Sequence, residues 1–334
     1  MKNKFLLSLG ALLVILFVFV FWVFSSPNTQ KAEVYIKTGD GMDSLHANLD
    51  RSKVIKNGFS FKVAQYVMKF KKIYPGKYVI MEGMTNRQII NLFKYGRQTE
   101  IEFRFGNNIR PYELYAVLGR KFEADSADFA MAINNKELME TLGLDSNSVL
   151  ALFWADTYKF PWAVLPDKMV RRFFNEHQLY WNTEKFNKLP NTGLKSAREV
   201  YILASIIEKE AMKKEELPIM AGVYINRLNI GMPLQADPTN KYATGDKTMR
   251  RIKGETLKII SPYNTYDNKG LPPGPIGIVT KVGIEAVLNF QQHDYLYFCA
   301  KEDFSNTHYF TKSYAEHLKN AAKYRAALDS RGIR

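Results

Sequence analysis

The chain begins with a long apolar run. Residues 5–24 carry no charge, and a helix of about this length crosses the core of a bilayer. Lys2 and Lys4 precede the run and the next basic residue is Lys31, so the positive-inside rule predicts a cytoplasmic N-terminus and an outward-facing remainder. A cleaved signal peptide is the alternative, but cleavable cores run to about 7–15 residues and end in small side chains. We therefore predict a single-pass protein of the inner (cytoplasmic) membrane, anchored by residues 1–28.

A small α+β module is predicted next, over residues 29–98. Its first residues belong to a polar stretch, 25–32, that indicates a short linker. The period of the apolar pattern then changes along the chain. It predicts strands at 33–37 and 77–80, and helices at 43–49, 60–70 and from Thr85, as N-cap, to Gly96. The apolar faces predicted for the last two helices are Phe61, Ala64, Val67 and Met68, and Ile89, Ile90 and Phe93.

A second, larger α+β region is predicted from residue 99 to residue 330. It begins with an alternating strand at 101–105, and the helix-rich stretch that follows, to about Leu189, is dense in aromatic residues. The aromatic runs at 153–158 and 160–162 have two interpretations, a groove in which sugars stack or ordinary core packing. We favour core packing, because aromatic residues in helix-rich segments usually serve it.

The strongest helix signal covers residues 197–214, with Ser196 as its N-cap. At about 100° per residue, Glu210 falls within the apolar arc of this helix, whereas Glu208 points the other way. A carboxyl group against aliphatic side chains loses hydration of its charged form, which raises its pKa and keeps it protonated near neutrality. A general acid needs this property, so Glu210 is the better candidate for one.

The alternative for Glu210 is structural, an i, i+4 pair with Lys214 on a solvated surface. Periodicity alone slightly favours that pair, since most helical glutamates are structural. The loops that follow favour the catalytic interpretation of Glu210. They combine Pro and Gly, which fix the backbone, with polar side chains that offer paired hydrogen bonds to a sugar. These loops are residues 221–228, 231–239, 261–266 and 270–276.

The composition narrows the choice of partner and cofactor. Lys and Arg exceed Asp and Glu by 14, which indicates an anionic partner. For an outward-facing chain we expect anionic lipid or cell-wall polymer and no nucleic acid, which requires basic clusters on one face and a cytoplasmic location. The single cysteine, Cys299, cannot form an intramolecular disulfide and is expected to be a small buried hydrophobe within a strand at 295–300. Metal-ligand and phosphate-loop spacings are absent, so no metal or other cofactor is implied.

Several motifs in one order closely resemble the YceG-like endolytic murein transglycosylases over nearly the whole chain. They are Ala204-Ser205-Ile206-Ile207-Glu208-Lys209-Glu210, Asn226-Arg227-Leu228, Leu234-Gln235-x-Asp237-Pro238-Thr239, Tyr263-Asn264-Thr265-Tyr266, the loop from Gly270 to Ile276, and His308-x-Phe310. Residues 76–90 resemble the LysM-like region found ahead of the enzyme domain in that family. The fold class implied is α+β, with a transmembrane helix, a LysM-like module and a catalytic domain at 99–330 whose core is 195–330.

The resemblance implies a lytic transglycosylase that cleaves the MurNAc-β-1,4-GlcNAc bond of nascent glycan strands and leaves 1,6-anhydro-MurNAc ends. It assigns catalysis to Glu210, which acts first as acid on the glycosidic oxygen and then as base on the 6-hydroxyl of the muramic acid. The partners implied are peptidoglycan strands, the membrane and, as candidates, cell-wall synthases. The residues we expect to hold the sugars are Asn226, Gln235, Asp237, Thr239, Tyr263, Asn264, Tyr266 and His308.

Two other functions stay open at this point. A muramidase would hydrolyse the same bond with the same acid and a second carboxylate, for which Asp237 is the candidate. A scaffold that only binds peptidoglycan would not depend on Glu210. The departures from the family pattern are Ala155, where proline is often found, and Ala236, which replaces Ser or Thr and so removes a hydroxyl from a loop expected to face substrate.

Overall fold

The computed structural model describes all residues except 1, 29, 107–108, 247–248, 250–253 and 333–334. The predicted α+β class is confirmed, since helices predominate and the strands form two-stranded sheets. The chain divides into two compact units. The first unit is Met1–Phe103, Leu118–Ser126 and Tyr158–Leu165, and the second is Arg104–Val117, Ala127–Thr157 and Pro166–Arg334.

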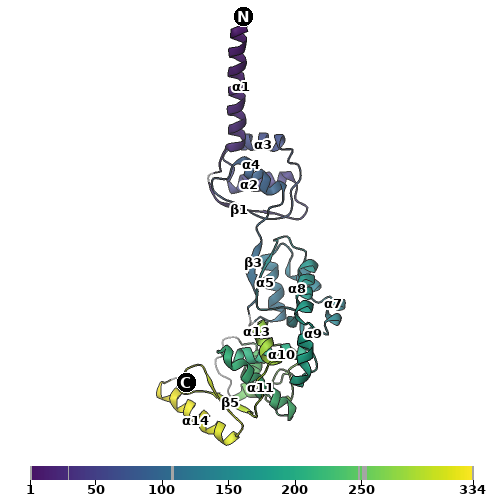
Figure 1. Cartoon of the computed structure of the whole chain (residues 1–334), viewed down its shortest axis with the longest axis vertical. Helices are drawn as coiled ribbons and strands as arrows, with labels where there is room; N and C mark the ends of the chain where they lie inside the picture. Colours follow the sequence, from purple (N-terminus) through teal and green to yellow (C-terminus); the bar gives the residue numbers. More distant parts are fainter. Residues whose placement is uncertain (1, 29, 107–108, 247–248, 250–253, 333–334) are drawn as a thin grey trace. The chain divides into compact units, whose positions relative to one another are not determined.

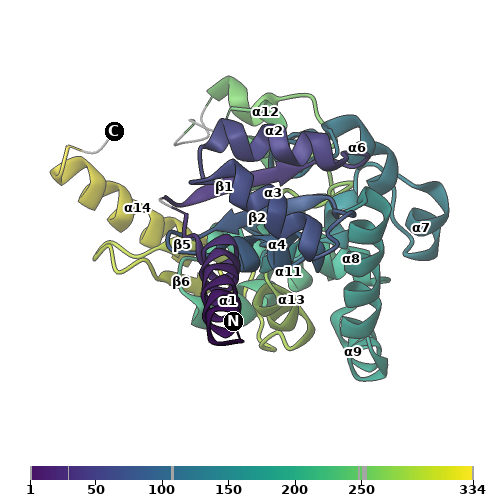
Figure 2. The ribbon, with the colours of Figure 1, turned by 90° about the horizontal axis from the view of Figure 1, so that it is seen from above.

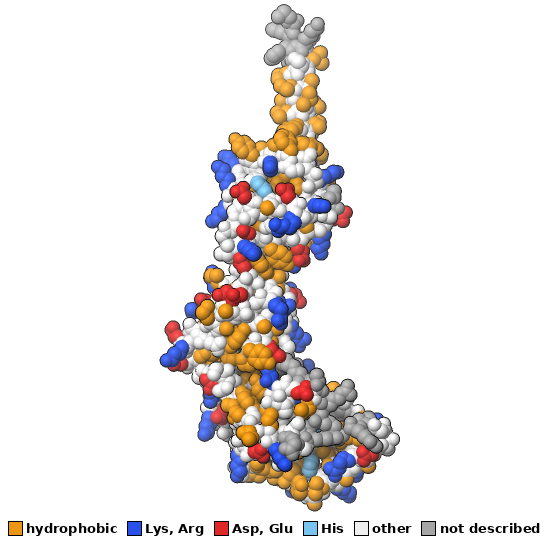
Figure 3. Space-filling view, turned by 180° about the vertical axis from the view of Figure 1, so that it is seen from behind, with side chains coloured by type: hydrophobic (Ala, Val, Ile, Leu, Met, Phe, Trp, Pro, Cys, Tyr) orange, Lys and Arg blue, Asp and Glu red, His pale blue; other side chains and the backbone are white. Residues whose placement is uncertain are grey.

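The apolar N-terminal run forms α1 (Lys2–Ser25). Within the described part of the chain it is the one helix long and apolar enough to cross a membrane, judged by length and composition. Its large apolar side chains from Leu7 to Trp22 are exposed, and Figure 3 shows orange side chains along this helix with no charged side chain among them. Exposed apolar surface of this extent is typical of a segment that lies in lipid.

The rest of the first unit is built on a small antiparallel sheet. The elements are β1 (Ala32–Ile36), α2 (Met42–Ser52), α3 (Gly58–Val67), β2 (Gly76–Ile80) and α4 (Asn86–Lys94). Val34 of β1 is paired with Tyr78 of β2, and the helices lie between the sheet and the base of α1 (Figures 1 and 2). Thr85 caps α4 as predicted, in a reciprocal capping box with Gln88. The prediction for Val67 was wrong, because α3 ends there and the side chain faces solvent.

The predicted linker at 25–32 was also wrong for its first residues, because they pack against α4. Val23 lies in the apolar core of the first unit and is 1% exposed. The Asn86 side chain donates from Nδ2 to the Val23 carbonyl at 2.8 Å, and its backbone N–H donates to the Ser26 carbonyl at 3.2 Å. The N–H of Asn28 donates to the Met84 carbonyl at 2.9 Å. The end of α1 is therefore an integral part of the first unit.

Replacing Asn86 by alanine is expected to lower the free energy of unfolding of the first unit by about 1–3 kcal/mol, because the buried Val23 carbonyl then loses its donor. The measurement is hydrogen–deuterium exchange of the β1 and β2 amides in the full-length protein. Asn48→Ala is the matched control, since its amide donates to the Tyr35 carbonyl at the surface. Equal amide protection in Asn86→Ala and wild type would show that α1 is not held by this residue.

The second unit carries most of the remaining helices. Its elements are α6 (Ser126–Ile133), α7 (Lys136–Thr141), η1 (Val149–Leu152), α8 (Pro166–Tyr180), α9 (Thr183–Lys188), η2 (Leu189–Thr192), α10 (Ala197–Glu210), η3 (Lys214–Glu216), α11 (Leu217–Asn229), α12 (Asp237–Thr244), η4 (Gly254–Lys258), α13 (Lys281–Leu288), β5 (Tyr297–Ala300), β6 (His308–Thr311) and α14 (Tyr314–Ser330). Three further elements belong wholly or partly to the first unit: β3 (Ile101–Arg104), β4 (Thr157–Phe160) and the end of α5 (Pro111–Lys121).

α10 is the central helix of the second unit. Every residue from Val200 to Ile207 is buried, because α11, α12 and α13 all pack on this helix. The helix ends at Glu210, four residues before the predicted end, since Ala211 has an extended backbone. The favoured interpretation of the aromatic runs is confirmed for Phe153 and Trp154, which are buried. Cys299 is only half-buried, so the expected full burial was wrong.

Candidate active site at the end of helix α10

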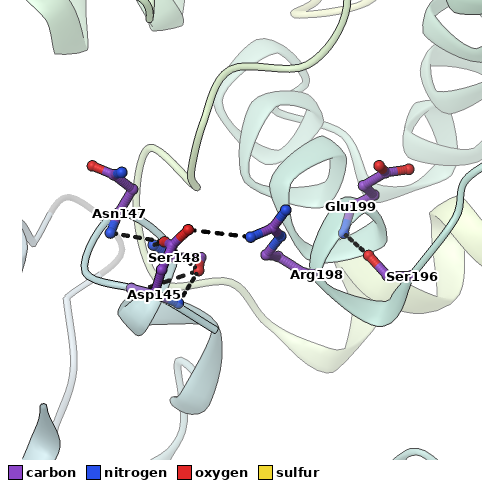
Figure 4. Close-up of polar contacts among 6 residues, drawn as sticks. All are labelled: Asp145, Asn147, Ser148, Ser196, Arg198 and Glu199. Carbon is purple, nitrogen blue, oxygen red and sulfur yellow. Dashed lines mark hydrogen bonds and ion pairs between the residues drawn. The ribbon is translucent and has the colours of Figure 1, made fainter. Parts of the chain in front are cut away.

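The start of α10 is fixed by polar contacts on two sides (Figure 4). The Ser196 side chain accepts from the backbone N–H of Glu199 at 3.3 Å, which confirms the predicted N-cap. Two residues later, the Arg198 guanidinium forms an ion pair with Asp145 at 3.2 Å. Asp145 also accepts from the backbone N–H of Ser148 at 2.9 Å. These contacts attach α10 to the preceding loop, so the far end of the helix is held in a defined direction.

Glu210 is the last residue of α10, and its carboxyl group interacts with polar groups of two other segments, α11 and the start of α12. The hydroxyl of Tyr224, from α11, donates to Glu210 Oε1 at 3.0 Å. Burial raises the pKa of Glu210 to about 8, and the nearby charge of Asp237 acts in the same direction. The Tyr224 hydrogen bond and the Arg227 charge oppose this increase. Glu210 is therefore protonated at neutral pH, which is the state that a general acid requires.

The proposed surface pair between Glu210 and Lys214 does not fit this geometry. Because α10 ends at Glu210, Lys214 lies in the short η3 and not one turn further along the same helix. Glu210 is partly buried and has Tyr224 as its hydrogen-bond partner.

Glu208 faces a different part of the second unit and has a structural environment. Its carboxyl accepts from the hydroxyl of Thr280 and from the backbone N–H of Thr280 at 3.2 Å. Thr280 is the N-cap of α13, and Gly283 lies so close that a Cβ there would be 2.5 Å from Glu208 Oε1. Glu208 thus connects α10 to the N-terminus of α13, where the helix dipole favours a negative charge. The two glutamates of the motif have separate surroundings.

Asp237 and Tyr266 form the second part of the site. The Tyr266 hydroxyl donates to Asp237 Oδ1 at 2.6 Å. The charge of Asp237 raises the pKa of Glu210, and the charge of Glu210 raises the pKa of Tyr266, so the three groups are electrostatically linked. Gln235 lies just before Asp237, is exposed, and has a positive φ of 51°. A left-handed backbone is uncommon for glutamine and marks a conformation imposed by the surroundings, here by the hydrogen bond from its N–H to the Thr265 carbonyl.

Tyr224 and Arg227 are site residues that the sequence did not single out. They are three positions apart on α11, so they share one side of that helix. Buried Arg227 donates from Nη1 to the Leu234 carbonyl at 2.7 Å and from Nε to the Leu296 carbonyl at 2.7 Å. It therefore holds the loop that carries Gln235 and Asp237. Arg227 belongs to the Asn226-Arg227-Leu228 motif and Tyr224 lies three positions before it, so this i, i+3 spacing was the signal available in the sequence.

Four of the predicted sugar-binding residues bond instead to the protein itself. The Asn226 amide donates to the carbonyls of His293 and Tyr295 at 2.7 and 3.0 Å. Asn264 is buried and donates to the carbonyls of Leu257 and Ile259, each at 3.0 Å. The buried Thr239 hydroxyl is bonded to Ala236 and Thr265. His308 Nδ1 lies 2.8 Å from a carboxyl oxygen of Glu216. These contacts hold the four side chains in place, and their part in sugar binding stays a prediction.

The loop from Gly270 to Ile276 packs back onto α10. The backbone N–H of Ile276 donates to the buried Ser205 hydroxyl at 3.0 Å. A Cβ at Gly274 would collide with the Asn147 carbonyl and lie 2.9 Å from the Tyr263 hydroxyl, so only glycine fits here. The half-buried Tyr263 ring also contacts Tyr242, with ring centroids 4.8 Å apart.

The side chain at position 236 does not face substrate, contrary to the expectation from the sequence. Ala236 is 0% exposed, and its backbone N–H donates to the Thr265 hydroxyl at 3.0 Å. A Ser or Thr hydroxyl at this position would point into the protein. Among the residues that the structure describes, no group of three or more His, Cys, Asp or Glu side chains is arranged to hold a metal ion.

Comparison with known proteins gives a consistent result. The model of the YceG-like family matches residues 34–323. An endolytic murein transglycosylase of Bacillus subtilis is 30% identical over 87% of this chain and 84% of its own length. One of Streptococcus pneumoniae is 25% identical over 87% of this chain, which corresponds to 58% of the longer pneumococcal protein. A crystal structure of a protein described as YceG-like from Listeria monocytogenes is 25% identical, covers 87% of this chain and 98% of its own, and has a TM-score of 0.57.

Proposed function

Because the chain belongs to the YceG-like family, we propose that it is a membrane-attached endolytic lytic transglycosylase of peptidoglycan. It cleaves the MurNAc-β-1,4-GlcNAc bond of glycan strands and leaves 1,6-anhydro-MurNAc ends. The observation that carries the proposal is Glu210, a partly buried carboxyl group that keeps its proton at neutral pH and lies beside Tyr224 and Asp237. No cofactor enters the reaction.

The chemistry needs one group that first donates and then accepts a proton. Glu210 donates its proton to the glycosidic oxygen as the bond from that oxygen to C1 of the muramic acid breaks. The 6-hydroxyl oxygen of the same sugar then bonds to C1, and its proton returns to Glu210. No water is consumed, so a second carboxylate that activates water is not required. Asp237, held by Tyr266, supplies negative charge near the positive charge that develops on the sugar.

Product analysis tests the proposal. The full-length protein in detergent is incubated with purified, uncrosslinked glycan strands, and the ends are identified by mass spectrometry. Anhydro-muramic ends are expected. Reducing ends would identify a muramidase, for which Asp237 is the second carboxylate, and strands that are bound but never cut would identify a scaffold. Either of these outcomes overturns the proposal.

The Tyr224→Phe variant is expected to shift the pH profile of cleavage to more alkaline values. In wild type, kcat/KM should fall above about pH 8, because Glu210 must be protonated to act as acid. The Tyr224 hydrogen bond lowers the pKa of Glu210, so its removal raises that pKa. The alkaline limb should then move to higher pH, and an unchanged limb would contradict the assignment of that limb to Glu210. Tyr295→Phe, on the segment before β5, is the control.

The finer organisation of the chain forms part of the proposal. Residues 1–28 are the anchor with a cytoplasmic N-terminus, residues 29–98 are a LysM-like module, and residues 99–330 are the catalytic domain on the outer side of the inner membrane. Charge around the apolar helix and the motif at residues 76–90 support this arrangement. Cell-wall synthases, which make nascent strands, are the candidate protein partners. Protease accessibility of the second unit in inverted vesicles tests the orientation, since only an outward-facing domain is protected there.

A further inference from the structure

Helix α3 carries apolar side chains on both of its sides. Phe61 and Ala64 are buried in the first unit. On the other side, Phe59, Tyr66 and Val67 are 66%, 86% and 56% exposed. Their spacing of seven and eight residues places these three on one face of the helix, which we call the outer face of α3. Large apolar groups gathered on an exposed face mark an interaction surface.

The outer face belongs to a helix that packs beside the end of α1. Helix α3 contacts α1 directly and lies across its base (Figure 1). Asn86 connects the two, since its Nδ2 donates both to the Val23 carbonyl and to the Ser60 hydroxyl of α3 at 3.0 Å. Trp22, the last exposed apolar residue of α1, is 40% exposed. Tryptophan at the end of a membrane span is typical of the lipid–water interface.

The length of α1 leaves no spacer between the first unit and a bilayer. Val23 already belongs to the core of the first unit. The apolar segment that remains for the membrane, Phe5–Trp22, spans about 27 Å at about 1.5 Å per residue. A bilayer core is about 30 Å thick. A membrane crossed by this segment therefore reaches the surface of the first unit next to α1, which is where α3 lies.

The charge of the segment around α3 favours a membrane that contains anionic lipids. Residues 51–80 contain no Asp or Glu. Six lysines of this segment are exposed: Lys53, Lys56, Lys62, Lys69, Lys71 and Lys72. Lys62 lies within α3 itself. An exposed apolar helix face within a lysine-rich segment that lacks acidic residues is the pattern of helices that lie in the interface of anionic bilayers.

We propose that the outer face of α3 inserts into the interfacial layer of the bilayer that α1 crosses, with the surrounding lysines on anionic lipid headgroups. Helix α3 is thus a second membrane contact, parallel to the surface. It prevents the first unit from tilting freely around α1. This inference rests on the membrane attachment in the proposed function, and it is independent of the catalytic part.

The test uses the full-length protein in nanodiscs of phosphatidylcholine with phosphatidylglycerol, in a Cys299→Ser background. An environment-sensitive fluorophore is attached at Tyr66→Cys, at Leu16→Cys within α1, or at Tyr112→Cys, a similarly exposed tyrosine of the second unit. Quenching by lipids that carry a quencher near the headgroup or, for position 16, within the acyl chains is compared with quenching by aqueous iodide. We expect the label at position 66 to be quenched several-fold more by lipid than the label at position 112. This difference should be smaller in nanodiscs of phosphatidylcholine alone.

The other outcomes separate the possible failures. If the label at 16 is quenched by lipid while those at 66 and 112 are equally open to iodide, α1 is an anchor and the inference is overturned. If the label at 16 is not quenched by lipid, the membrane attachment itself fails, and the inference fails with it. Protection of position 66 in native membranes but not in lipid nanodiscs would assign the face to a protein partner and overturn the lipid contact. Cleavage of glycan is measured separately, so loss of catalysis affects none of these readings.

Discussion

Replacing Glu210 by glutamine is expected to reduce glycan cleavage by about 10²–10⁴-fold, the range that one general acid–base group contributes. Glutamine keeps nearly the same shape and can still accept the Tyr224 hydrogen bond, but it has no proton to give to the glycosidic oxygen. The measurement is the rate at which anhydro-muramic ends form from uncrosslinked strands. Because substrate contacts are retained, strand binding should change little.

Glu208→Gln is the matched control for that variant, since the same substitution is made two residues away on the same helix. Glu208 bonds to Thr280 and not to the site, so its loss should weaken the junction of α10 with α13 and leave the chemistry of the products unchanged. If Glu208→Gln and Glu210→Gln lost activity equally while both remained folded, the assignment of the acid to Glu210 would be wrong.

Glu210→Gln is also expected to be more stable than wild type at alkaline pH. Folding raises the pKa of Glu210 from 4.5 to about 8, so the folded state holds this proton more tightly than the unfolded state. Wild type therefore loses stability as the pH rises between these two values, whereas the glutamine variant does not. The melting temperatures should be similar near pH 4 and diverge by pH 9, with the variant higher. A site that is built for chemistry at the expense of stability has this signature.

The Asp237→Asn variant is expected to lose about 10²–10³-fold in cleavage rate, as is typical when one electrostatic partner of a transition state is removed. The negative charge of Asp237 also raises the pKa of Glu210. Its removal lowers that pKa, so the alkaline limb of the pH profile should move to lower pH, opposite to the shift expected for Tyr224→Phe. The measurement is kcat/KM against pH for both variants on the same glycan preparation.

Asp267→Asn is the control for Asp237→Asn, because Asp267 is an exposed carboxylate that accepts a hydrogen bond from Asn264 in the loop. It should leave both the rate and the pH limb near those of wild type. If Asp237→Asn produced a normal rate with an unshifted limb, Asp237 would have no electrostatic role. If it abolished cleavage and the wild-type products had reducing ends, Asp237 would be the second carboxylate of a hydrolase.

The sequence predicted local structure well where one periodic pattern dominated. The Ser196 cap, the Thr85 capping box and the strands at the start of the module follow from signals within a few residues. The helical-face argument for Glu210 identified a residue whose surroundings suit an acid. It did not show that Glu208 is also enclosed, because that enclosure comes from Thr280, far away in the sequence.

Local patterns also do not show which partner a polar side chain binds. Asn226, Asn264 and Thr239 have side chains suited to sugars, but in the structure they donate hydrogen bonds to backbone carbonyls. The partner of Asn226 is His293, 67 residues away, and no local pattern reveals it. Conversely, Tyr224 and Arg227 looked like part of an ordinary buried helix. A polar residue in a motif can hold a site together or contact its ligand, and only the fold distinguishes the two.

The packing of α1 into the first unit has a practical consequence for the handling of this protein. A soluble fragment that starts near residue 30 lacks Val23, the Ser26 carbonyl and the Asn28 N–H. Its core therefore has a gap where Val23 packs. The backbone N–H of Asn86 and the carbonyl of Met84 also lose their hydrogen-bond partners. Proteolytic shedding of the anchor in a cell would produce the same damage. Such a fragment should unfold or aggregate more readily than the full-length chain, so low activity in it would reflect a broken fold and not an inactive enzyme.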